Sequence, residues 1–405
     1  MFIVGNMENS EVIIEKNKKK RRISPIILAV VITTVISVFI SFTLFYFVFI
    51  NDTGYLKLKE LEFIVKNNYY GEINEEKVID GIMRGYVSGL GDRFAGYYDK
   101  ESAAERSDSL SGNGKGIGII ITRHPDHGDI YISNVYNDSP AARAGLQKGD
   151  RIVSIDGVSV TETGYEKAVD SMLRQIGDTV SLSLVRGDAK YDTNIEYEEF
   201  AVQSIFYEML PDKVGYIQIT TFNAETVAQF KNAINQLTSK GATGLIFDLR
   251  SNGGGTVDSV TEMVDYLCPE GTIMTVKYAN GQTETLAKSD PDEIDLPMAV
   301  LTNELSASAS ELFTASIKDF GKGISVGNNT FGKGVMQTTY TLHDSTSVSF
   351  TVAEFFPHSG KSFNEKGIAP DIEVKFTEEQ EKYKYQLSYS QDPYIVSAME
   401  YLKKQ

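Results

Sequence analysis

The segment from Ile23 to Ile50 constrains the fold most, because it is apolar and no charged side chain interrupts it. As a helix it would be about 42 Å long, more than the roughly 30 Å hydrocarbon core of a bilayer. A basic cluster, Lys16 to Arg22, comes immediately before it, and basic flanks favour the cytoplasmic side of a membrane. The sequence therefore predicts a membrane-spanning helix over residues 23–50, with residues 1–22 as a basic cytoplasmic tail.

The alternative for this segment is a cleavable signal peptide. Such a peptide has an apolar region of about 7 to 15 residues that ends at a small-x-small cleavage site. The apolar segment is longer, and no such site follows it. We therefore expect an uncleaved single-pass anchor that leaves the chain after Asn51 outside the cytoplasm.

Composition excludes several classes of protein. The 405 residues, 41% of them hydrophobic, are enough for several folded units rather than a single core. The net charge of −16, from 39 basic and 55 acidic residues, argues against a nucleic-acid-binding surface. Cys268 is the single cysteine in the sequence, so an internal disulfide or a cysteine-based metal cluster is excluded.

Hydrophobic periodicity divides the exported chain into four regions. Residues 55–111 predict helices that break near Gly89 and Gly91, and the polar run Ser107–Gly114 is interpreted as a linker. Residues 114–186 predict a β-rich module whose expected elements are strands at Ile117–Thr122, Asp129–Val135, Arg151–Ile155 and Thr179–Val185 and a helix at Thr163–Gln175.

In residues 200–375 buried strands alternate with helices, which favours a largely parallel sheet covered by helices. The expected elements are Val214–Ile219, Val227–Thr238, Gly244–Leu249, Val257–Leu267, Ala299–Thr302 and Ser308–Asp319. Residues 376–405 are interpreted as a helical tail that is peripheral or partly disordered. The predicted fold class is thus multidomain α+β, with an α/β core around a mixed sheet.

Turn residues carry the clearest signal in the β-rich module. Ser139 and Pro140 open a short helix that Gly145 ends, and alone they specify only tight turns. Together with Gly116-Ile117-Gly118-Ile119 the ordered set resembles a PDZ domain. The resemblance implies that the amides of Gly116, Ile117, Gly118 and Ile119 bind the carboxylate of a protein C-terminus while the peptide adds as a strand.

The segment Ser306–Glu311 reads SASASE and leads into an apolar helix. Ser308 and Glu311 have the spacing of a capping box, which alone would explain both residues. A cap requires one hydroxyl, however, and this segment has three serines between alanines. A serine at a helix N-terminus also lies beside amides and a positive dipole that can stabilise an oxyanion.

A nucleophilic serine needs a base. The sequence has neither a His-Glu-x-x-His nor a Gly-x-Ser-x-Gly motif. Of the four histidines, His124 and His127 fall on a polar turn of the β-rich module, while His343 and His358 stay open as bases. The other candidate is Lys333.

Two other interpretations of Lys333 also stay open. It could be a solvated lysine between Gly332 and Gly334. It could also end a phosphate loop, Gly327–Lys333, although Gly334 replaces the hydroxyl residue that such a loop needs for magnesium.

The ordered motifs resemble those of the C-terminal processing peptidases, or tail-specific proteases. They are Gly253-Gly254-Gly255 after Asp248-Leu249-Arg250, then Ser306–Glu311, Gly332-Lys333-Gly334 with Gln337, and Lys366–Ile372. The resemblance implies that Ser308 is the nucleophile, Lys333 the general base and Gln337 the residue that holds the lysine amine. It also implies an oxyanion hole from the Gly254 and Ala309 amides, with no metal and no cofactor.

This assignment makes a physical demand. A lysine with its ordinary pKa near 10.4 is protonated at neutral pH and cannot act as a base. Burial must lower that pKa, and neither Glu311 nor Asp319 should contact the amine.

The sequence thus predicts a membrane-anchored serine endopeptidase of a bacterial surface that cleaves proteins recognised by their C-terminal tails. A PDZ scaffold without activity is the main alternative, and a nucleotide-binding protein is the third. The sequence leaves open a homodimer, an adaptor protein, and whether peptide capture switches the site on.

Overall fold

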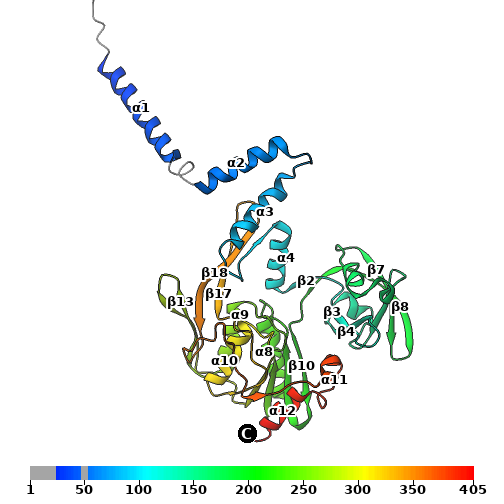
Figure 1. Cartoon of the computed structure of the whole chain (residues 1–405). Coiled ribbons are helices and arrows are strands. Elements are labelled where there is room, and N and C mark those ends of the chain that lie inside the picture. Colours follow the sequence, from blue (N-terminus) through cyan, green and yellow to red (C-terminus); the bar gives the residue numbers. More distant parts are fainter. Residues whose placement is uncertain (1–23, 47–52) are drawn as a thin grey trace, which may run out of the picture. The chain divides into compact units, whose positions relative to one another are not determined.

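The computed structural model of the chain describes residues 24–46 and 53–405. The chain divides into two compact units, residues 1–79 and residues 80–405. The first contains α1 (Pro25–Phe45), α2 (Thr53–Asn68) and the start of α3 (Glu75–Ser88) (Figure 1).

Helix α1 is long and apolar enough to cross a membrane. Its segment Pro25–Leu44 has a mean hydropathy of 2.6, and none of it is buried in the structure. A signal sequence near an N-terminus meets the same criterion. The predicted basic tail, residues 1–22, and the two ends of the predicted span lie outside the described residues.

The helices of the N-terminal region are confirmed, and α3 ends at Ser88 just before the expected break. The predicted linker Ser107–Gly114 is wrong, since α4 (Lys100–Ser111) includes its first half. The Asp99 carboxylate caps α4 by accepting the Ser102 N–H at 3.0 Å, and Gly112 ends it at a φ of 84°. A helix that is polar all round has no apolar stripe from which it could be predicted.

The β-rich module has one antiparallel sheet in the order β3-β4-β5-β7-β8, with β6 paired to β5. Its strands are β3 (Ile119–Arg123), β4 (Ile130–Val135), β5 (Arg151–Ile155), β6 (Val158–Ser159), β7 (Thr179–Arg186) and β8 (Ala189–Glu196). The module's short helices are α5 (Pro140–Arg143), α6 (Val160–Thr163) and α7 (Tyr165–Asp170). The four predicted strands are present, the helix ends earlier than expected, and the sheet extends beyond residue 186 to β8.

A second sheet forms the centre of the core, in the order β10-β11-β12-β15-β16-β19. These strands are β10 (Ile205–Leu210), β11 (Val214–Ile219), β12 (Gly244–Asp248), β15 (Met298–Thr302), β16 (Gly323–Gly327) and β19 (Ile372–Glu373). All neighbours are parallel except β10 and β11, so the mixed sheet is confirmed. A short pair, β2 (Asn113–Gly116) and β9 (Glu198–Ala201), joins the module to this core.

Helices cover both faces of the core sheet. Leu245 and Phe247 of β12 pack with α8 (Thr226–Ser239), α9 (Val257–Leu267) and α10 (Ala309–Asp319) on one face. Ile246 points to the other face, where it packs with α12 (Pro393–Leu402). This alternation follows from the two-residue period of a strand.

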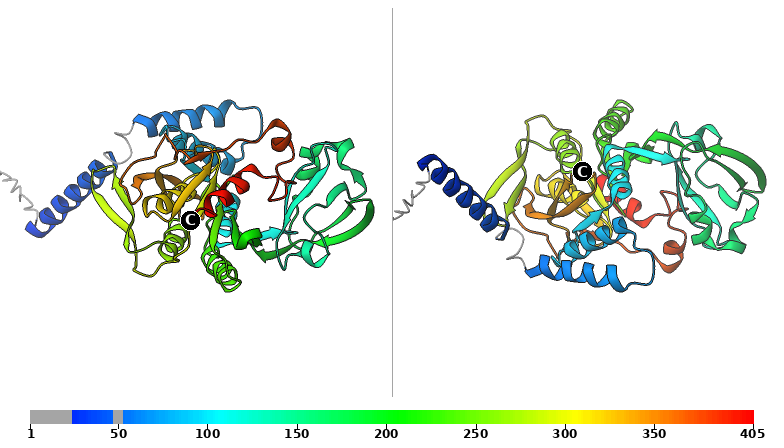
Figure 2. Two further views of the ribbon diagram at one scale, coloured as in Figure 1. Left: turned by 90° about the horizontal axis from the view of Figure 1, so that it is seen from below. Right: turned by 90° about the horizontal axis from the view of Figure 1, so that it is seen from above.

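The C-terminal region is therefore not a peripheral tail. Helix α12, red in Figure 2, buries Tyr394, Ile395, Ala398, Met399 and Leu402 against the core sheet. The preceding α11 (Glu378–Lys382) is short and polar. The composition of residues 376–405 is dominated by this polar stretch, which concealed the apolar face of α12.

A further antiparallel sheet was not anticipated from the sequence. It contains β1 (Gly96–Tyr98), β13 (Gly271–Tyr278), β14 (Thr283–Ser289), β17 (Val335–Thr341) and β18 (Ser347–Phe356). Strand β1 pairs with β18, which also pairs with β17. The pairing brings the loop before β1 to the strands that follow Lys333.

Candidate active site

Ser308 lies on a strained turn between β15 and α10. Its backbone has a φ of 58° and a ψ of −113°, and a non-glycine residue at such angles costs about 1 to 3 kcal/mol. Strain of this kind is often found at functional sites, and a sharp strand-to-helix turn exposes a nucleophile. Ala307 and Ala309 are the small neighbours here, so this turn forms without a Gly-x-Ser-x-Gly motif.

The two flanking serines have structural partners. The Ser306 hydroxyl donates to the Leu249 carbonyl at 2.8 Å, and the Ser310 hydroxyl donates to the Asn252 carbonyl at 2.9 Å. Both serines are buried, whereas Ser308 is partly exposed. The three serines are thus separated by their surroundings, and Ser308 is the one that substrate can reach.

Gly254 lies directly against this turn. With a φ of 105°, a Cβ at this position would lie 2.9 Å from the Ser308 Cβ and 2.9 Å from the Ala307 carbonyl oxygen. Glycine is therefore required. The Gly254 N–H donates to Asn252 Oδ1 at 2.8 Å, so it is engaged in this conformation. The Ala309 N–H, at the N-terminus of α10, has no acceptor in the described part of the chain.

One buried carboxylate connects the serine turn to the lysine turn. Glu311 Oε2 accepts the Ser308 N–H at 2.9 Å and the Lys333 N–H at 2.8 Å. Glu311 Oε1 accepts the Thr330 hydroxyl at 2.6 Å and the Gly332 N–H at 2.7 Å. The Ser308 N–H bond is the one expected of a capping box, but the carboxylate also fixes the backbone that carries Lys333.

The Lys333 amine is half-buried and lies over the ring of Phe94, with Nζ 4.7 Å from the ring centroid. Over residues 24–46 and 53–405, no hydrogen bond or ion pair to Nζ is present. Burial lowers the pKa of the amine and Arg106 lowers it further, while Asp92 and Glu311 act in the opposite direction. Asp319 accepts the Ser359 N–H at 3.0 Å instead, so neither acidic residue named from the sequence pairs with the amine.

Gln337 makes no hydrogen bond to the lysine amine among the described residues. Its Nε2 donates to the Val335 carbonyl at 3.2 Å and to the Thr351 hydroxyl at 3.1 Å. A β-bulge in the pairing of β17 with β18 falls between Met336 and Gln337. The structure therefore places Gln337 beside β18, and its predicted hydrogen bond to the Lys333 amine is not formed within that part of the chain.

Three of the four histidines, His124, His127 and His358, have partners away from Ser308. His358 Nδ1 lies 2.9 Å from the Thr272 carbonyl, and the ring stacks on Phe320. The rings of His124 and His127 lie 4.6 Å apart within the β-rich module. Among the described residues, none of the four histidines contacts Ser308.

Sequence reasoning missed the residues that surround the lysine amine. Phe94 and Asp92 lie on the loop before β1, and Arg106 lies on α4. No periodicity or motif indicates that this loop reaches Lys333, because the approach depends on the long-range pairing of β1 with β18.

The predicted carboxylate-binding loop lies where a strand could be added. Gly118 has a φ of 81°, and a Cβ there would lie 2.3 Å from the Ser139 Cβ. The loop leads into β3, which is an edge strand of its sheet. Half-buried apolar side chains of β3 (Ile119, Ile121) and α7 (Tyr165, Val169) pack against the module's core.

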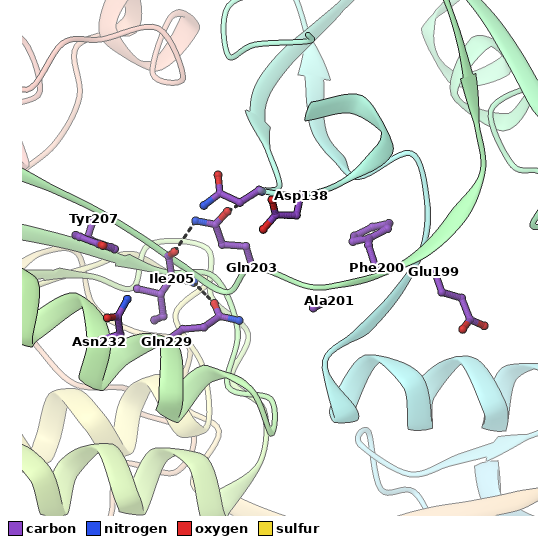
Figure 3. Close-up of a pocket in the computed structure, with 10 residues that line it drawn as sticks. Asp138, Glu199, Phe200, Ala201, Gln203, Ile205, Tyr207, Gln229 and Asn232 are labelled. Carbon is purple, nitrogen blue, oxygen red and sulfur yellow. Dashed lines mark hydrogen bonds between the residues drawn. The ribbon is translucent and has the colours of Figure 1, made fainter. Parts of the chain in front are cut away.

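A cavity of about 360 Å³ lies where the module meets the core (Figure 3). Gln203 holds the two sides together, since its Oε1 accepts the Asn137 N–H at 3.0 Å and its Nε2 donates to the Ile205 carbonyl at 2.9 Å. The lining is mainly polar and amide-rich, with Gln229 and Asn232 from α8.

Comparison with known protein families gives two matches. The profile described as peptidase family S41 matches residues 213–374, and the PDZ domain profile matches residues 107–185. The first match covers the core sheet from β11 to β19 and includes both Ser308 and Lys333. The second covers most of the β-rich module.

Curated relatives match over most of the chain. The chain is 32% identical to the carboxy-terminal processing protease CtpA of Bacillus subtilis over 326 residues, which is 80% of this chain and 70% of the relative. It is 30% identical to CtpB of the same organism over 330 residues, 80% of this chain and 68% of that one.

A solved structure of an S41 protease from Bacteroides fragilis has a similar fold. It aligns with a TM-score of 0.58 at 17% identity and covers 83% of this chain and 91% of that chain. This likeness concerns the fold alone.

Proposed function

Since this chain belongs to the C-terminal processing peptidases of peptidase family S41 and contains a PDZ domain, we propose that it is a membrane-anchored endopeptidase with a Ser308–Lys333 catalytic pair. It would act outside the cytoplasm on proteins with accessible C-terminal tails. A serine-type peptidase is what the family supports directly, and the pair, the anchor and the topology are the proposal.

The observation that carries the catalytic pair is the bridge through Glu311. A single oxygen, Oε2, accepts the backbone N–H groups of both Ser308 and Lys333. Two turns that are distant in the sequence are thereby tied to the same buried atom. A scaffold without activity would gain nothing from a strained, partly exposed serine whose backbone is tied to that of a lysine.

The proposed chemistry is acyl transfer. The neutral Lys333 amine takes the proton of Ser308 Oγ as this oxygen attacks a peptide carbonyl. The amine then gives the proton to the departing nitrogen, and water releases the acyl group from Ser308. The lowered pKa of Lys333 favours the neutral form that this step requires.

The tetrahedral oxyanion would lie at the N-terminus of α10. The Ala309 N–H has no other acceptor in the described residues and is aligned with the positive end of the helix dipole. The Gly254 N–H could join it only after leaving Asn252 Oδ1. Gln337 would hold the amine through its Oε1, because its Nε2 already donates to Val335 and Thr351.

Substrate capture is assigned to the PDZ domain. The amides of Gly116, Ile117, Gly118 and Ile119 would bind a terminal carboxylate, and the tail would pair with the open edge of β3. Helix α1 would hold the enzyme at the outer face of a cell membrane.

The test uses the full chain in detergent micelles with an unfolded protein that has an apolar C-terminus. Ser308→Ala and Lys333→Ala should each abolish cleavage while both still bind a peptide with the same C-terminus. Equal digestion by the three proteins would refute the catalytic pair. Loss of peptide binding in both variants would instead indicate a folding defect.

A further inference from the structure

We propose that Phe94 is a positioning residue whose ring covers the Lys333 amine and keeps water away from it. This inference rests on the proposed function, because it assigns a role to Phe94 only if Lys333 is the base. The loop that carries Phe94 belongs to the region before the PDZ domain, far from Lys333 in the sequence.

Hydrogen bonds of the Asp92 carboxylate fix the loop that carries Phe94. Asp92 Oδ1 accepts the Phe94 N–H at 2.9 Å, and Asp92 Oδ2 accepts the Thr351 N–H of β18 at 2.8 Å. The Thr351 hydroxyl in turn accepts Gln337 Nε2 at 3.1 Å. Through Phe94 the loop contacts the lysine amine. Through Asp92 it binds β18, the strand that pairs with β17 and Gln337.

The ring has two opposite effects on the amine. Contact with the face of a phenyl ring attracts a cation, and more strongly where water is excluded. Removal of water from a lysine can shift its pKa by up to about 3 to 5 units, or about 4 to 7 kcal/mol, when burial is complete. Burial is the largest of the effects on the Lys333 pKa and lowers it, so exclusion of water is the effect of the ring on which the inference rests.

The charged groups around the amine come from two helices and the loop. Arg106 on α4 opposes protonation, whereas Asp92 on the loop and Glu311 on α10 favour it. The Glu311 carboxylate is occupied by backbone and hydroxyl donors. The guanidinium of Arg93 lies 4.6 Å from the Phe94 ring and 5.5 Å from the ring of Phe331. Arg93 therefore helps to hold the Phe94 ring in its position over the amine.

The test is the pH dependence of kcat/KM for the full chain. Phe94→Ala should move the acidic limb of the pH profile to higher pH by about one unit. At pH 7 this shift lowers kcat/KM by about tenfold, and the activity returns at higher pH. Phe94→Gln, which keeps a side chain of similar length but brings a polar group, should move it in the same direction. Phe94→Leu should restore the wild-type limb, because leucine also excludes water. Tyr340→Ala, which removes a half-exposed ring from β17, is the matched control and should leave the limb unmoved.

A second readout does not depend on catalysis. In a Ser308→Ala background, the rate at which acetic anhydride acetylates Lys333 is followed against pH by mass spectrometry. Phe94→Ala should raise the midpoint of that curve by the same amount as the limb of kcat/KM.

An unmoved limb and midpoint in Phe94→Ala and Phe94→Gln would overturn the inference about Phe94. A uniform loss of activity that high pH does not recover would also overturn it. If Lys333→Ala instead cleaves normally, the proposed function fails, and the acetylation curves still report whether Phe94 covers the amine.

Discussion

The serine turn and the lysine side chain differ in how completely they are held. Around Ser308 the neighbouring serines, Gly254 and Glu311 all have partners, most of them buried. The Lys333 backbone is held by the same carboxylate, but its amine makes no hydrogen bond within the described residues and lies over the Phe94 ring. The turn of the proposed nucleophile is thus held on all sides, whereas no hydrogen bond joins Ser308 to the amine of the proposed base within the described residues.

This difference has a physical origin. Backbone amides and hydroxyls must find hydrogen-bond partners when a turn is buried, so many bonds fix the turn that carries Ser308. A base must instead stay free of strong partners, because a nearby carboxylate would stabilise its protonated form. The loosely held amine is therefore the expected arrangement for a lysine that has to exchange a proton.

The strongest test of this comparison breaks the link between the two turns. In Glu311→Gln one of the two carboxylate oxygens becomes an NH2 group, which can only donate. Both oxygens accept hydrogen bonds in the wild type, so at least one buried N–H loses its acceptor. We expect unfolding to become easier by about 3 kcal/mol and cleavage to fall by at least about a hundredfold. Denaturant titration and kcat/KM measure the two effects. The control is Glu304→Gln, an exposed glutamate on the loop that precedes α10, and equal behaviour of the two variants would contradict the role of Glu311.

The next test disturbs the serine side alone. Gly254→Ala places a Cβ 2.9 Å from the Ser308 Cβ at a φ that alanine rarely adopts. Cleavage should fall by about a hundredfold, because a shift of about 1 Å at a reacting atom has this cost. Gly253→Ala is the control, since no atom lies within 4 Å of its added Cβ. Similar kcat values for both glycine variants would show that the close approach is not needed.

A smaller effect is expected on the lysine side. Gln337→Ala should lower kcat by about tenfold with little change in KM if this amide orients the amine during catalysis. Thr351→Val removes the hydroxyl that Gln337 contacts in this structure but leaves Gln337 in place. If Thr351→Val causes the same loss, Gln337 serves only to hold β18.

The smallest effect concerns stability and pH. Because burial lowers the pKa of Lys333 in the folded protein, the unfolded chain binds more protons between that pKa and 10.5. Stability therefore rises with pH across this window. Lys333→Met should be more stable than the wild type at pH 7, by under about 1 kcal/mol for a half-buried group, and the difference should shrink toward pH 10.5. Thermal unfolding at several pH values measures it, with exposed Lys361→Met as the control, and a difference that does not change with pH would contradict the shift.

Much of the core was predictable because its elements are local and periodic. Val214–Ile219 and Val257–Leu267 were predicted with the bounds that the structure has. The burial of α12 and the last turns of α4 were not predicted, because α12 follows a polar stretch and α4 has no apolar stripe. The antiparallel sheet of β1, β13, β14, β17 and β18 depends on pairings between distant segments, and single-sequence patterns do not encode them.

The sequence by itself determined the family, the order of the domains and the candidate residues, because turn glycines, small residues and apolar periods act over a few positions. Only the tertiary structure decided which serine is accessible, that Glu311 joins the two turns, and that Phe94 covers the lysine amine. These features arise from contacts across the core, where burial and hydrogen-bond partners are set by segments far apart in the chain.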